Sequence, residues 1–391
     1  MRVFLISLLM AFSSLLAAQC GNRYTTPIFP NTSTSIHQYG ENTDYSGANK
    51  KLSLDLYSPV GDTVKNRPCV VFCFGGGFVS GVRSSPELVF FASQLAQRGF
   101  VCASIDYRLD NQANLTANGE NGAVIRAVQD AKAAIRFLKS KSSDFGIDSS
   151  MMFIGGTSAG GITALTLGYS QYDDFKDSVK ISINNLGGWD GTTNSLAPTS
   201  RVKGLFNFAG GILDTNHISS IDLPVYLNHA NGDATVPFRS GYPLNGQSKT
   251  FIHGSYNVAQ RMKSMGNYYV LDSFKSSDHP AFASADFLTA LTNLNLTSEN
   301  LRKFLYKVMK CDQGTSSLAD LQTPKIYFEN PVRSILTLSE GVNADAIELY
   351  NLLGKKVELK NENSKTIDVG NIARGIYLIK YKESVQKIVL E

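Results

Sequence analysis

The sequence contains one serine whose neighbours would suit nucleophilic chemistry. Ser158 lies at the centre of the run 155–161, which reads Gly-Gly-Thr-Ser-Ala-Gly-Gly and contains the spacing Gly-x-Ser-x-Gly. A serine nucleophile on a sharp turn between a strand and a helix needs small neighbours, because larger side chains would clash there. The following helix would bring its positive end near a developing oxyanion. The alternative is a glycine-rich turn that only lets a helix pack closely against a strand.

A second glycine cluster, Gly75–Gly77, follows an apolar strand upstream of the serine. Glycines let backbone N–H groups approach a substrate carbonyl closely, and each such donor lowers the barrier by about 2.7–4 kcal/mol. The competing interpretation is a phosphate-binding loop. Neither Gly-x-Gly-x-x-Gly nor a P-loop sequence occurs in the chain, so nucleotide binding is weakly supported.

A serine nucleophile needs a histidine base and an acidic partner. When the serine lies on a turn of this kind, the acid and then the histidine come after it in the sequence. Asp233 comes soon after the strand-like run 223–228 and is the predicted acid. His279 lies between the last strand and the last helix, which favours it over His253 as the base. His229, four residues before Asp233, is predicted to be a structural residue or one that contacts the catalytic side chains without touching the substrate. The alternatives are a surface turn for Asp233 and a helix-capping loop for His279. The remaining histidines, which come too early in the chain, are His37 and His217.

The segment from about 51 to 305 must position these residues, and it alternates strand-like with helix-like runs. Cys69–Phe74 is a continuous apolar run, which indicates a strand covered on both faces. Apolar residues recur every three or four positions from Val124 to Leu138, as on one face of a long helix. This alternation predicts an α/β fold with a mostly parallel central sheet and helices on both faces. Further strands are predicted at 52–56, 100–106, 151–154, 202–208, 223–228 and 268–274, and helices at 85–99, 160–167, 255–265 and 281–309.

Both ends of the chain differ from this segment. Residues 1–19 combine Arg2, an apolar run and small residues before Gln19, in the order of a secretory signal peptide. No segment reaches ~18 consecutive apolar residues, so no transmembrane helix is predicted. Residues 312–323 are a predicted polar linker, and the short strands expected in 324–391 predict a small all-β sandwich. The catalytic domain is therefore expected at 20–311.

The composition excludes several other classes of protein. Lys and Arg number 37 against 33 Asp and Glu, and the small net charge of +4 argues against nucleic acid as the main partner. A hydrophobic fraction of 43% with 18% charged residues excludes wholesale disorder. No pair of Cys-x-x-Cys motifs and no His-Glu-x-x-His occurs, so no metal site is predicted.

The five cysteines are an odd number, so they cannot all pair within one chain. Cys69 and Cys73 would lie about 13 Å apart in one strand, too far for a disulfide, and with Cys102 they are interpreted as core residues. A Cys20–Cys311 disulfide is possible but has no support in the sequence. Lipid attachment at Cys20 is not expected, because Gln19 is a poor residue before a lipidated cysteine.

Residues 52–282 together resemble the α/β-hydrolase superfamily, and within it the secreted esterases related to hormone-sensitive lipase and to bifunctional acetylxylan/feruloyl esterases. Besides the two glycine clusters, the matching pieces are Ile105–Leu109, Asp130–Leu138 and Phe145–Asp148. The resemblance implies Ser158 as the nucleophile, Asp233 as the acid and His279 as the base. It also implies an oxyanion hole formed by the backbone N–H groups of Gly76, Gly77 and Ala159.

Two features depart from this family. The family usually has a histidine before the three glycines, where this chain has Phe74. That histidine braces the loop, so its absence bears on the rigidity of the loop more than on the chemistry. The spacing of 46 residues between acid and base is also long, which predicts an inserted loop around 238–249.

Trp189, the only tryptophan, could line a substrate cleft, although a lone tryptophan more often belongs to the core or rim.

The tail, residues 325–391, is similar to the C-terminal sorting domain of the type IX secretion system of Bacteroidetes. The residues that carry this resemblance are Asn330-Pro331, the run 347–355, Gly375–Tyr377 and the closing run 387–390. The resemblance implies recognition by an export machine, with the domain cleaved or the protein tethered at the outer surface. A carbohydrate-binding β-module is the alternative.

These observations predict a secreted or outer-surface carboxylic-ester hydrolase with a Ser-His-Asp triad, an acyl-enzyme intermediate and no cofactor. Its substrates would be short-acyl or aryl esters, such as acetylated or feruloylated polysaccharide. The expected partners are an ester substrate, small or polymeric, and the export machinery. One alternative is a serine peptidase of the prolyl-oligopeptidase type, although no repeat of propeller-blade length occurs. The other is a catalytically silent surface binding protein.

Overall fold

The computed structural model describes residues 20–111, 117–219, 223–311, 332–338, 342–351, 355–361, 363, 365–381 and 384–390. The predicted signal peptide (1–19) and linker (312–323) lie outside these residues. The chain divides into two compact units, 1–314 and 315–391. The predicted domain boundaries fall within or beside the residues that are not described, and they stay predictions.

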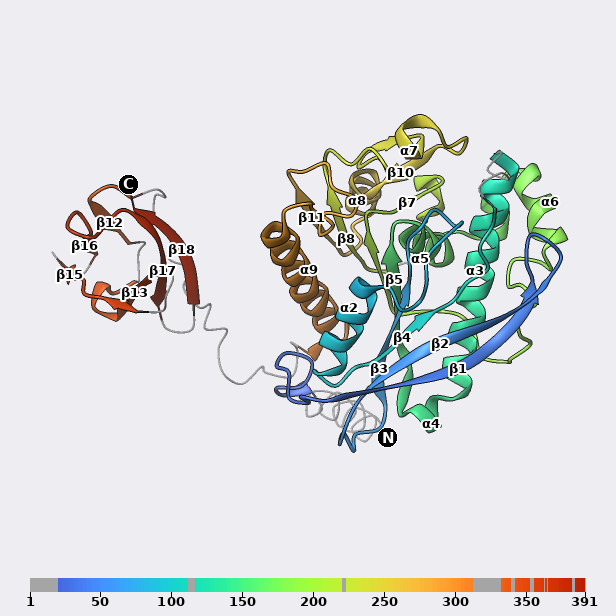
Figure 1. The fold of residues 1–391 in the computed structure, drawn as a ribbon, viewed down its shortest axis with the longest axis horizontal. Coiled ribbons are helices and arrows are strands. Elements are labelled where there is room, and N and C mark those ends of the chain that lie inside the picture. Colours follow the sequence, from blue (N-terminus) through green and yellow to red (C-terminus); the bar gives the residue numbers. More distant parts are fainter. Residues whose placement is uncertain are drawn as a thin grey trace, which may run out of the picture. The chain divides into compact units, whose positions relative to one another are not determined.

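The centre of the larger unit is an eight-stranded sheet (Figure 1). Its strands are β1 (Thr32–Thr43), β2 (Asn49–Pro59), β3 (Arg67–Cys73), β4 (Val101–Ile105), β5 (Ile147–Thr157), β6 (Gly204–Phe208), β8 (Val225–Ala230) and β11 (Tyr269–Phe274). Their order in the sheet is β1-β2-β4-β3-β5-β6-β8-β11. The pairs β1–β2 and β2–β4 are antiparallel, and every pair from β4 to β11 is parallel. Every residue of β3 is buried, as its apolar sequence predicts for a central parallel strand.

Helices cover both faces of this sheet. The described helices of this unit are α2 (Pro86–Ala96), α3 (Ala117–Ser140), α4 (Ser142–Phe145), α5 (Ala159–Tyr169), α6 (Asp177–Asn185), α7 (Pro243–Gly246), α8 (Ser255–Ser264) and α9 (Phe287–Val308), with 3-10 turns at Tyr172–Asp174 and Thr215–His217. A further 3-10 turn, Ala344–Ala346, belongs to the smaller unit. Helix α2 packs against β4 and α9, whereas α3 and α5 pack against each other and against β5. Figure 1 shows these two groups of helices on opposite sides of the sheet. The predicted mostly parallel α/β arrangement is confirmed.

Three local differences from the prediction have physical causes. The last helix begins at Phe287 rather than Ala281, because the Asp286 side chain accepts a hydrogen bond from the Thr289 N–H and caps the helix there. Strand β1 was not predicted, because its sequence is polar and most of its residues are exposed or half-buried at the sheet edge. A small antiparallel sheet, which was also not predicted, consists of β7 (Gly211–Ile212), β9 (Ser240–Gly241) and β10 (Ile252–Gly254). Strand β9 and helix α7 fall within the predicted inserted loop around 238–249, and β10 comes shortly after it.

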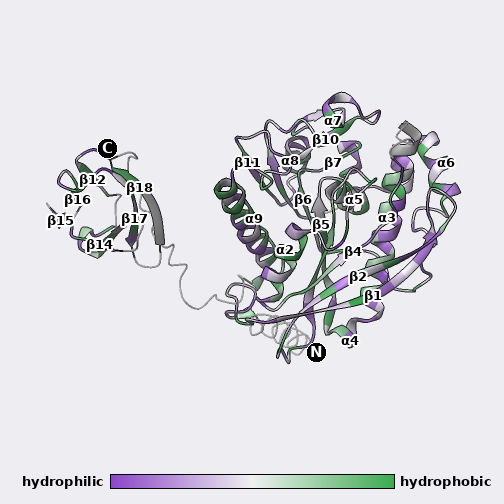
Figure 2. Cartoon of the chain, viewed as in Figure 1, coloured by the Kyte–Doolittle hydropathy of each residue, from purple (hydrophilic) through white to green (hydrophobic). Residues whose placement is uncertain are grey.

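Helix α9 carries hydrophobic residues along its length, with polar residues between them (green and purple in Figure 2). Its later turns bury Leu301, Phe304 and Leu305 in the main core, whereas Phe287 and Leu288 in its first turn are 74% and 70% exposed. The helix is therefore anchored by its C-terminal half.

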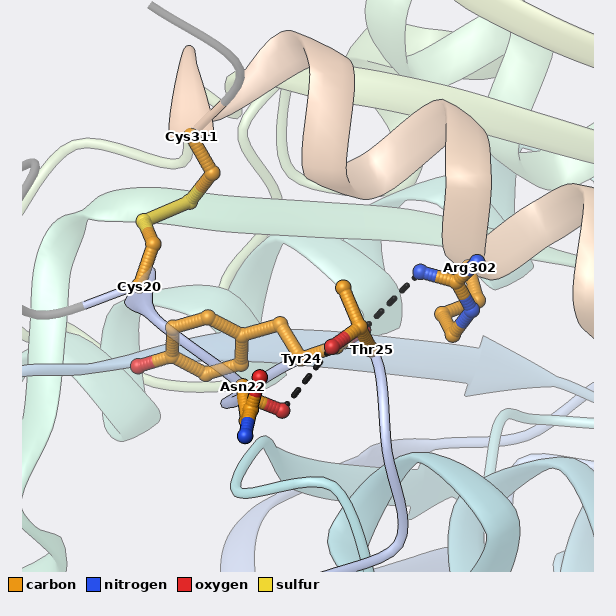
Figure 3. The surroundings of a disulfide bond; sticks show 6 residues. All are labelled: Cys20, Asn22, Tyr24, Thr25, Arg302 and Cys311. Carbon is orange, nitrogen blue, oxygen red and sulfur yellow. Dashed lines mark hydrogen bonds between the residues drawn. A yellow bond between two sulfur atoms is a disulfide. The ribbon is translucent and has the colours of Figure 1, made fainter. Parts of the chain in front are cut away.

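A disulfide between Cys20 and Cys311 joins the start of the described chain to a residue three positions after the end of α9 (Figure 3). Beside it, the Arg302 guanidinium of α9 donates a hydrogen bond to the Tyr24 carbonyl, with 3.2 Å between Nη1 and O. The remaining cysteines are buried and unpaired, as predicted, and they are Cys69, Cys73 and Cys102. Because the Cys20 sulfur is bonded to Cys311, it is not available for a lipid thioether.

The smaller unit is all-β and has a hydrophobic core of its own. Its strands are β12 (Ile335–Thr337), β13 (Ile347–Asn351), β14 (Lys356–Val357), β15 (Lys360–Asn361), β16 (Thr366–Asp368), β17 (Gly375–Tyr381) and β18 (Ser384–Leu390). They form two antiparallel sheets, β12-β16-β15 and β14-β13-β17-β18. Leu336 of the first sheet and Ile379 of the second belong to one buried cluster, so the two sheets form the predicted sandwich. Asn330-Pro331 and residues 352–354 of the predicted motif lie outside the described residues.

Candidate active site

The turn between β5 and α5 carries Ser158 in a strained backbone conformation. Its φ of 53° and ψ of −116° lie in a region that non-glycine residues seldom adopt. The glycines at 156 and 160 bring this turn against the end of β3, because a Cβ atom at either would overlap the carbonyl oxygen of Cys73. The sequence thus folds locally into a turn that presents one hydroxyl above the sheet.

The structure brings Ser158, His279 and Asp233 together, although they are far apart in the sequence. His279 Nε2 lies 2.8 Å from Ser158 Oγ, and His279 Nδ1 lies 2.6 Å from Asp233 Oδ2. Since a carboxylate accepts hydrogen bonds, Nδ1 carries the hydrogen and Nε2 is free to accept the serine proton. Asp233 and His279 follow β8 and β11, which are parallel neighbours, so both loops meet Ser158 at the same edge of the sheet.

The surroundings of Asp233 keep its carboxylate ionised. The Asp233 side chain is fully buried, and its Oδ1 accepts hydrogen bonds from the backbone N–H groups of Thr235 (2.8 Å) and Val236 (3.0 Å). Burial would raise the pKa of this carboxyl, but hydrogen bonds from His229, His279 and the Val236 backbone outweigh burial and lower its pKa to about 2. A charged acid can therefore orient the neighbouring imidazole and stabilise its protonated form.

The predicted oxyanion-hole residues border the same space as Ser158. Gly76 and Gly77 have φ angles of 118° and 61°, and a Cβ at position 76 would overlap the carbonyl of Ser80. Ala159 is the first residue of α5, where a helix leaves backbone N–H groups without helical partners. All three residues line the cavity in front of Ser158. Their assignment as the oxyanion hole stays a prediction.

A cavity of about 500 Å³ lies in front of Ser158 and His279. Its walls are mainly apolar, with side chains from the glycine loop, α3, α5 and the segment 235–252. The apolar lining residues include Phe78, Val79, Val124, Ile162, Leu213, Val236, Leu244 and Ile252. A cavity of this size and polarity suits a small uncharged organic group.

Two matches to known families cover most of the chain. Residues 54–247 match the BD-FAE family, and residues 326–391 match the secretion system C-terminal sorting domain. The chain carries a BD-FAE domain followed by a sorting domain. Both predicted resemblances are confirmed, and the sorting domain indicates export through its secretion machinery. Ser158 and Asp233 lie within the range that matches the BD-FAE family, whereas His279 lies beyond it.

Curated relatives of the BD-FAE domain carry esterase names. Gut esterase 1 of Caenorhabditis elegans is 28% identical over 149 residues, which are 38% of this chain and 26% of that protein. A probable isoprenylcysteine alpha-carbonyl methylesterase of Arabidopsis thaliana is 30% identical over 167 residues, which are 42% of this chain and 33% of that protein. This chain thus spans about a quarter to a third of the length of these relatives.

A solved structure supports the fold. A propionate-bound thermophilic esterase from the Planctomycetes species Thermogutta terrifontis superposes with a TM-score of 0.51 at 22% identity, covering 69% of this chain and 94% of its own. This similarity confirms the predicted α/β-hydrolase fold. The esterase names of the two curated relatives agree with the predicted class, a serine hydrolase of the carboxylesterase type.

Phe74 occupies the BD-FAE domain position at which a histidine was expected, and it braces the glycine loop by packing. Its ring is buried and stacks on Tyr107, with 4.1 Å between ring centroids. The Tyr107 hydroxyl donates a hydrogen bond to the Phe74 carbonyl (2.9 Å), and a Cβ at Gly81 would overlap the Phe74 ring. Stacking and one hydrogen bond to the backbone thus hold the start of the loop in the absence of a histidine.

The other histidines of the BD-FAE domain lie away from Ser158. His217 is buried with Nδ1 2.7 Å from Ser170 Oγ, and burial lowers the pKa of its imidazole. His229 lies behind Asp233, as predicted for a supporting residue. Trp189 packs on Phe175 and under the Lys132 ammonium, and it is not among the described residues that line the Ser158 cavity.

Sequence reasoning missed two contributors to the cavity. Glu87 and the segment 243–252 both line it, and no local pattern marks either of them as close to Ser158.

Within the part of the chain that is described, no group of three or more His, Cys, Asp or Glu side chains could hold a metal ion. No described helix is long and apolar enough to cross a membrane.

Proposed function

We propose that this protein is a secreted carboxylic-ester hydrolase in which Ser158 is the nucleophile, His279 the general base and Asp233 the acid that orients it. The observation that carries the proposal is the 2.8 Å contact between Ser158 Oγ and His279 Nε2 at the wall of an apolar cavity. The esterase names of the relatives support the same reaction class.

The reaction follows from the hydrogen positions. Ser158 Oγ forms a bond to the ester carbonyl carbon while its proton moves to His279 Nε2. The negative charge on the carbonyl oxygen would be held by backbone N–H groups of Gly76, Gly77 and Ala159. As the C–O bond to the alcohol breaks, His279 gives its proton to the leaving oxygen. Water then attacks the acyl-enzyme with His279 again as base, which releases the acid and restores Ser158.

The cavity indicates the size of the substrate group, and the two ends of the sequence indicate where the protein acts. A mainly apolar cavity of about 500 Å³ accommodates short-acyl or aryl groups, including the acetyl and feruloyl groups of plant polysaccharide. The methylesterase name of one relative also indicates a small substrate group. We further propose that the signal peptide (1–19) directs the chain across the inner membrane before the sorting domain is recognised.

The test is the turnover of p-nitrophenyl acetate by the mature protein and by Ser158→Ala. We expect the variant to lose at least about 1,000-fold in kcat while it stays folded, because the nucleophile is removed. A fluorophosphonate probe should label the wild type but not the variant, since only an activated serine reacts.

Ser182→Ala is the matched control, because Ser182 lies in α6 and is not among the described residues that line the cavity. It should keep both turnover and labelling. Wild-type turnover in Ser158→Ala would contradict the assignment of the nucleophile. An unlabelled wild type would favour the silent binding protein, and cleavage of a proline amide in preference to the ester would favour the peptidase.

A further inference from the structure

Two imidazoles share one oxygen of Asp233. His279 Nδ1 lies 2.6 Å from Asp233 Oδ2, and His229 Nε2 lies 3.2 Å from the same atom. The His229 side chain is fully buried near the end of β8, four residues before the acid. Two backbone N–H groups bind the other carboxylate oxygen, Oδ1. The direction of Oδ2 therefore depends on its contacts with these two histidines.

The neighbours of His229 determine where its hydrogen lies. His229 Nε2 is 2.9 Å from the Val236 carbonyl oxygen, which can only accept, so Nε2 carries the hydrogen. His229 Nδ1 then accepts from Ser255 Oγ at 2.8 Å. Ser255 Oγ in turn accepts from Asn207 Nδ2 at 3.0 Å, because that amide nitrogen also faces the Gly210 carbonyl oxygen at 3.3 Å.

These bonds form one buried chain of donors that ends at the Nε2 hydrogen of His229, which faces both the Val236 carbonyl oxygen (2.9 Å) and Asp233 Oδ2 (3.2 Å). Asn207, Ser255 and His229 have no exposed surface, and they come from β6, α8 and β8. Asn207 also lies under the serine turn, since a Cβ at Gly161 would overlap its Oδ1 atom. Asn207 Oδ1 has no hydrogen-bond partner among the described residues, so the network is held by Asn207 Nδ2, Ser255 Oγ and the two ring nitrogens of His229. Rotation of Ser255 or His229 would leave a further buried polar atom unpaired, which favours one geometry for both side chains.

We propose that His229 is a positioning residue, which aims Oδ2 of Asp233 at His279 because its Nε2 hydrogen is shared between the Val236 carbonyl oxygen and Oδ2. The inference rests on the proposed function, since it concerns the same triad. With both carboxylate oxygens held, Oδ2 keeps a lone pair directed at His279 Nδ1 throughout the reaction. Loss of the His229 donor frees Oδ2 to turn away from His279, so the imidazole loses its orientation toward Ser158.

The decisive comparison is between three substitutions of His229. His229→Phe keeps a ring but removes the donor, and we expect kcat to fall about 100-fold with KM within about twofold, as for a misplaced catalytic group. The amide of His229→Gln can reach the position of Nε2 and should recover most of kcat. The shorter His229→Asn reaches only the Nδ1 position beside Ser255 and should resemble His229→Phe.

His217→Phe is the matched control for the loss of a buried histidine. His217 has the same kind of contact, 2.7 Å from Nδ1 to a buried serine hydroxyl, but it is not in contact with Asp233. We expect its substitution to lower the thermal midpoint and to leave kcat at the wild-type value. A purely structural role for His229 would give it the same pattern as His217.

Ester turnover by the wild type tests the proposed function, and the ratios of variant to wild-type kcat test the role of His229. A folded His229→Phe with wild-type kcat would overturn the proposal. If His229→Phe does not fold, equal kcat values for His229→Gln and His229→Asn would overturn it. A KM effect without a kcat effect would also contradict a positioning role.

Discussion

At the scale of single residues, Glu87 is the acidic side chain among the described residues that line the cavity. It lies in the first turn of α2, where a negative charge is favourable, and its Oε1 accepts a hydrogen bond from Ser85 Oγ at 2.9 Å. The other lining side chains are mostly apolar, so this carboxylate is poorly screened from a bound substrate. It should therefore repel substrates that carry a negative charge.

Replacing Glu87 with glutamine should relax this selectivity. The amide oxygen can still accept from Ser85, so the start of α2 keeps its hydrogen bond. We expect kcat/KM for the anionic ester 4-acetoxybenzoate to rise roughly threefold to tenfold, because a repulsion of about 1 kcal/mol is removed. Phenyl acetate, the uncharged analogue, should be turned over at the wild-type rate. An unchanged ratio between the two esters at low salt would show that Glu87 does not act on substrate charge.

The positions of Ser158, Asp233 and His279 could be predicted because each follows a strand, and the carboxyl ends of parallel strands meet at one edge of a sheet. The contact of His229 with Asp233 could be expected only in general terms, since its register depends on how the turn 231–236 folds back over β8. Glu87 could not be predicted, because its place depends on how α2 packs beside the glycine loop.

At the scale of secondary-structure elements, a buried ion pair joins the segment after β4 to α3. Arg108 Nε lies 2.9 Å from Asp130 Oδ2, and the two side chains are 1% and 0% exposed. The Arg108 backbone N–H and the Thr193 hydroxyl donate to the same carboxylate, at 2.8 and 2.7 Å. Burial raises the pKa of Asp130 even though these bonds oppose it. Because Tyr107, which stacks on Phe74, directly precedes Arg108, this pair also supports the glycine loop.

Asp130→Asn should destabilise the larger unit by about 3–5 kcal/mol, because it leaves a buried guanidinium without its counter-charge. Urea unfolding followed by tryptophan fluorescence measures this, since Trp189 is the only tryptophan. The double variant Arg108→Met, Asp130→Leu should recover part of the loss, as no buried charge then remains unpaired. A loss below about 1 kcal/mol in Asp130→Asn would indicate that water reaches the pair.

The alternation of strands and helices could be predicted because buried strands are continuously apolar and the helices have apolar stripes. The same reasoning fails where elements are short or polar. Strand β1 pairs along the exposed edge with a polar sequence, and β7, β9 and β10 have two or three residues each. Elements of that length are determined by the surrounding tertiary contacts rather than by a periodic pattern.

At the scale of the whole molecule, each unit has its own hydrophobic core, and the larger one is closed covalently at its ends. The main core and the core of the smaller unit share no residue. The Cys20–Cys311 disulfide spans 291 positions and encloses the whole BD-FAE domain, whereas the sorting domain lies beyond it. Export to an oxidising environment allows such a bond to form and persist.

Removing this disulfide should destabilise the larger unit without changing its chemistry. A cross-link that closes so long a loop reduces the entropy of the unfolded chain, which corresponds to about 6 kcal/mol in the chain-entropy model. We therefore expect the double variant Cys20→Ser, Cys311→Ser to unfold at a clearly lower urea concentration, while kcat for p-nitrophenyl acetate at 25 °C stays at the wild-type value. Wild-type protein treated with a reducing agent should match the variant, because the other three cysteines are buried and unpaired. If reduction leaves the urea midpoint unchanged, the bond is not formed in the exported protein, and the N-terminal segment is held to α9 by contacts such as Arg302–Tyr24 alone.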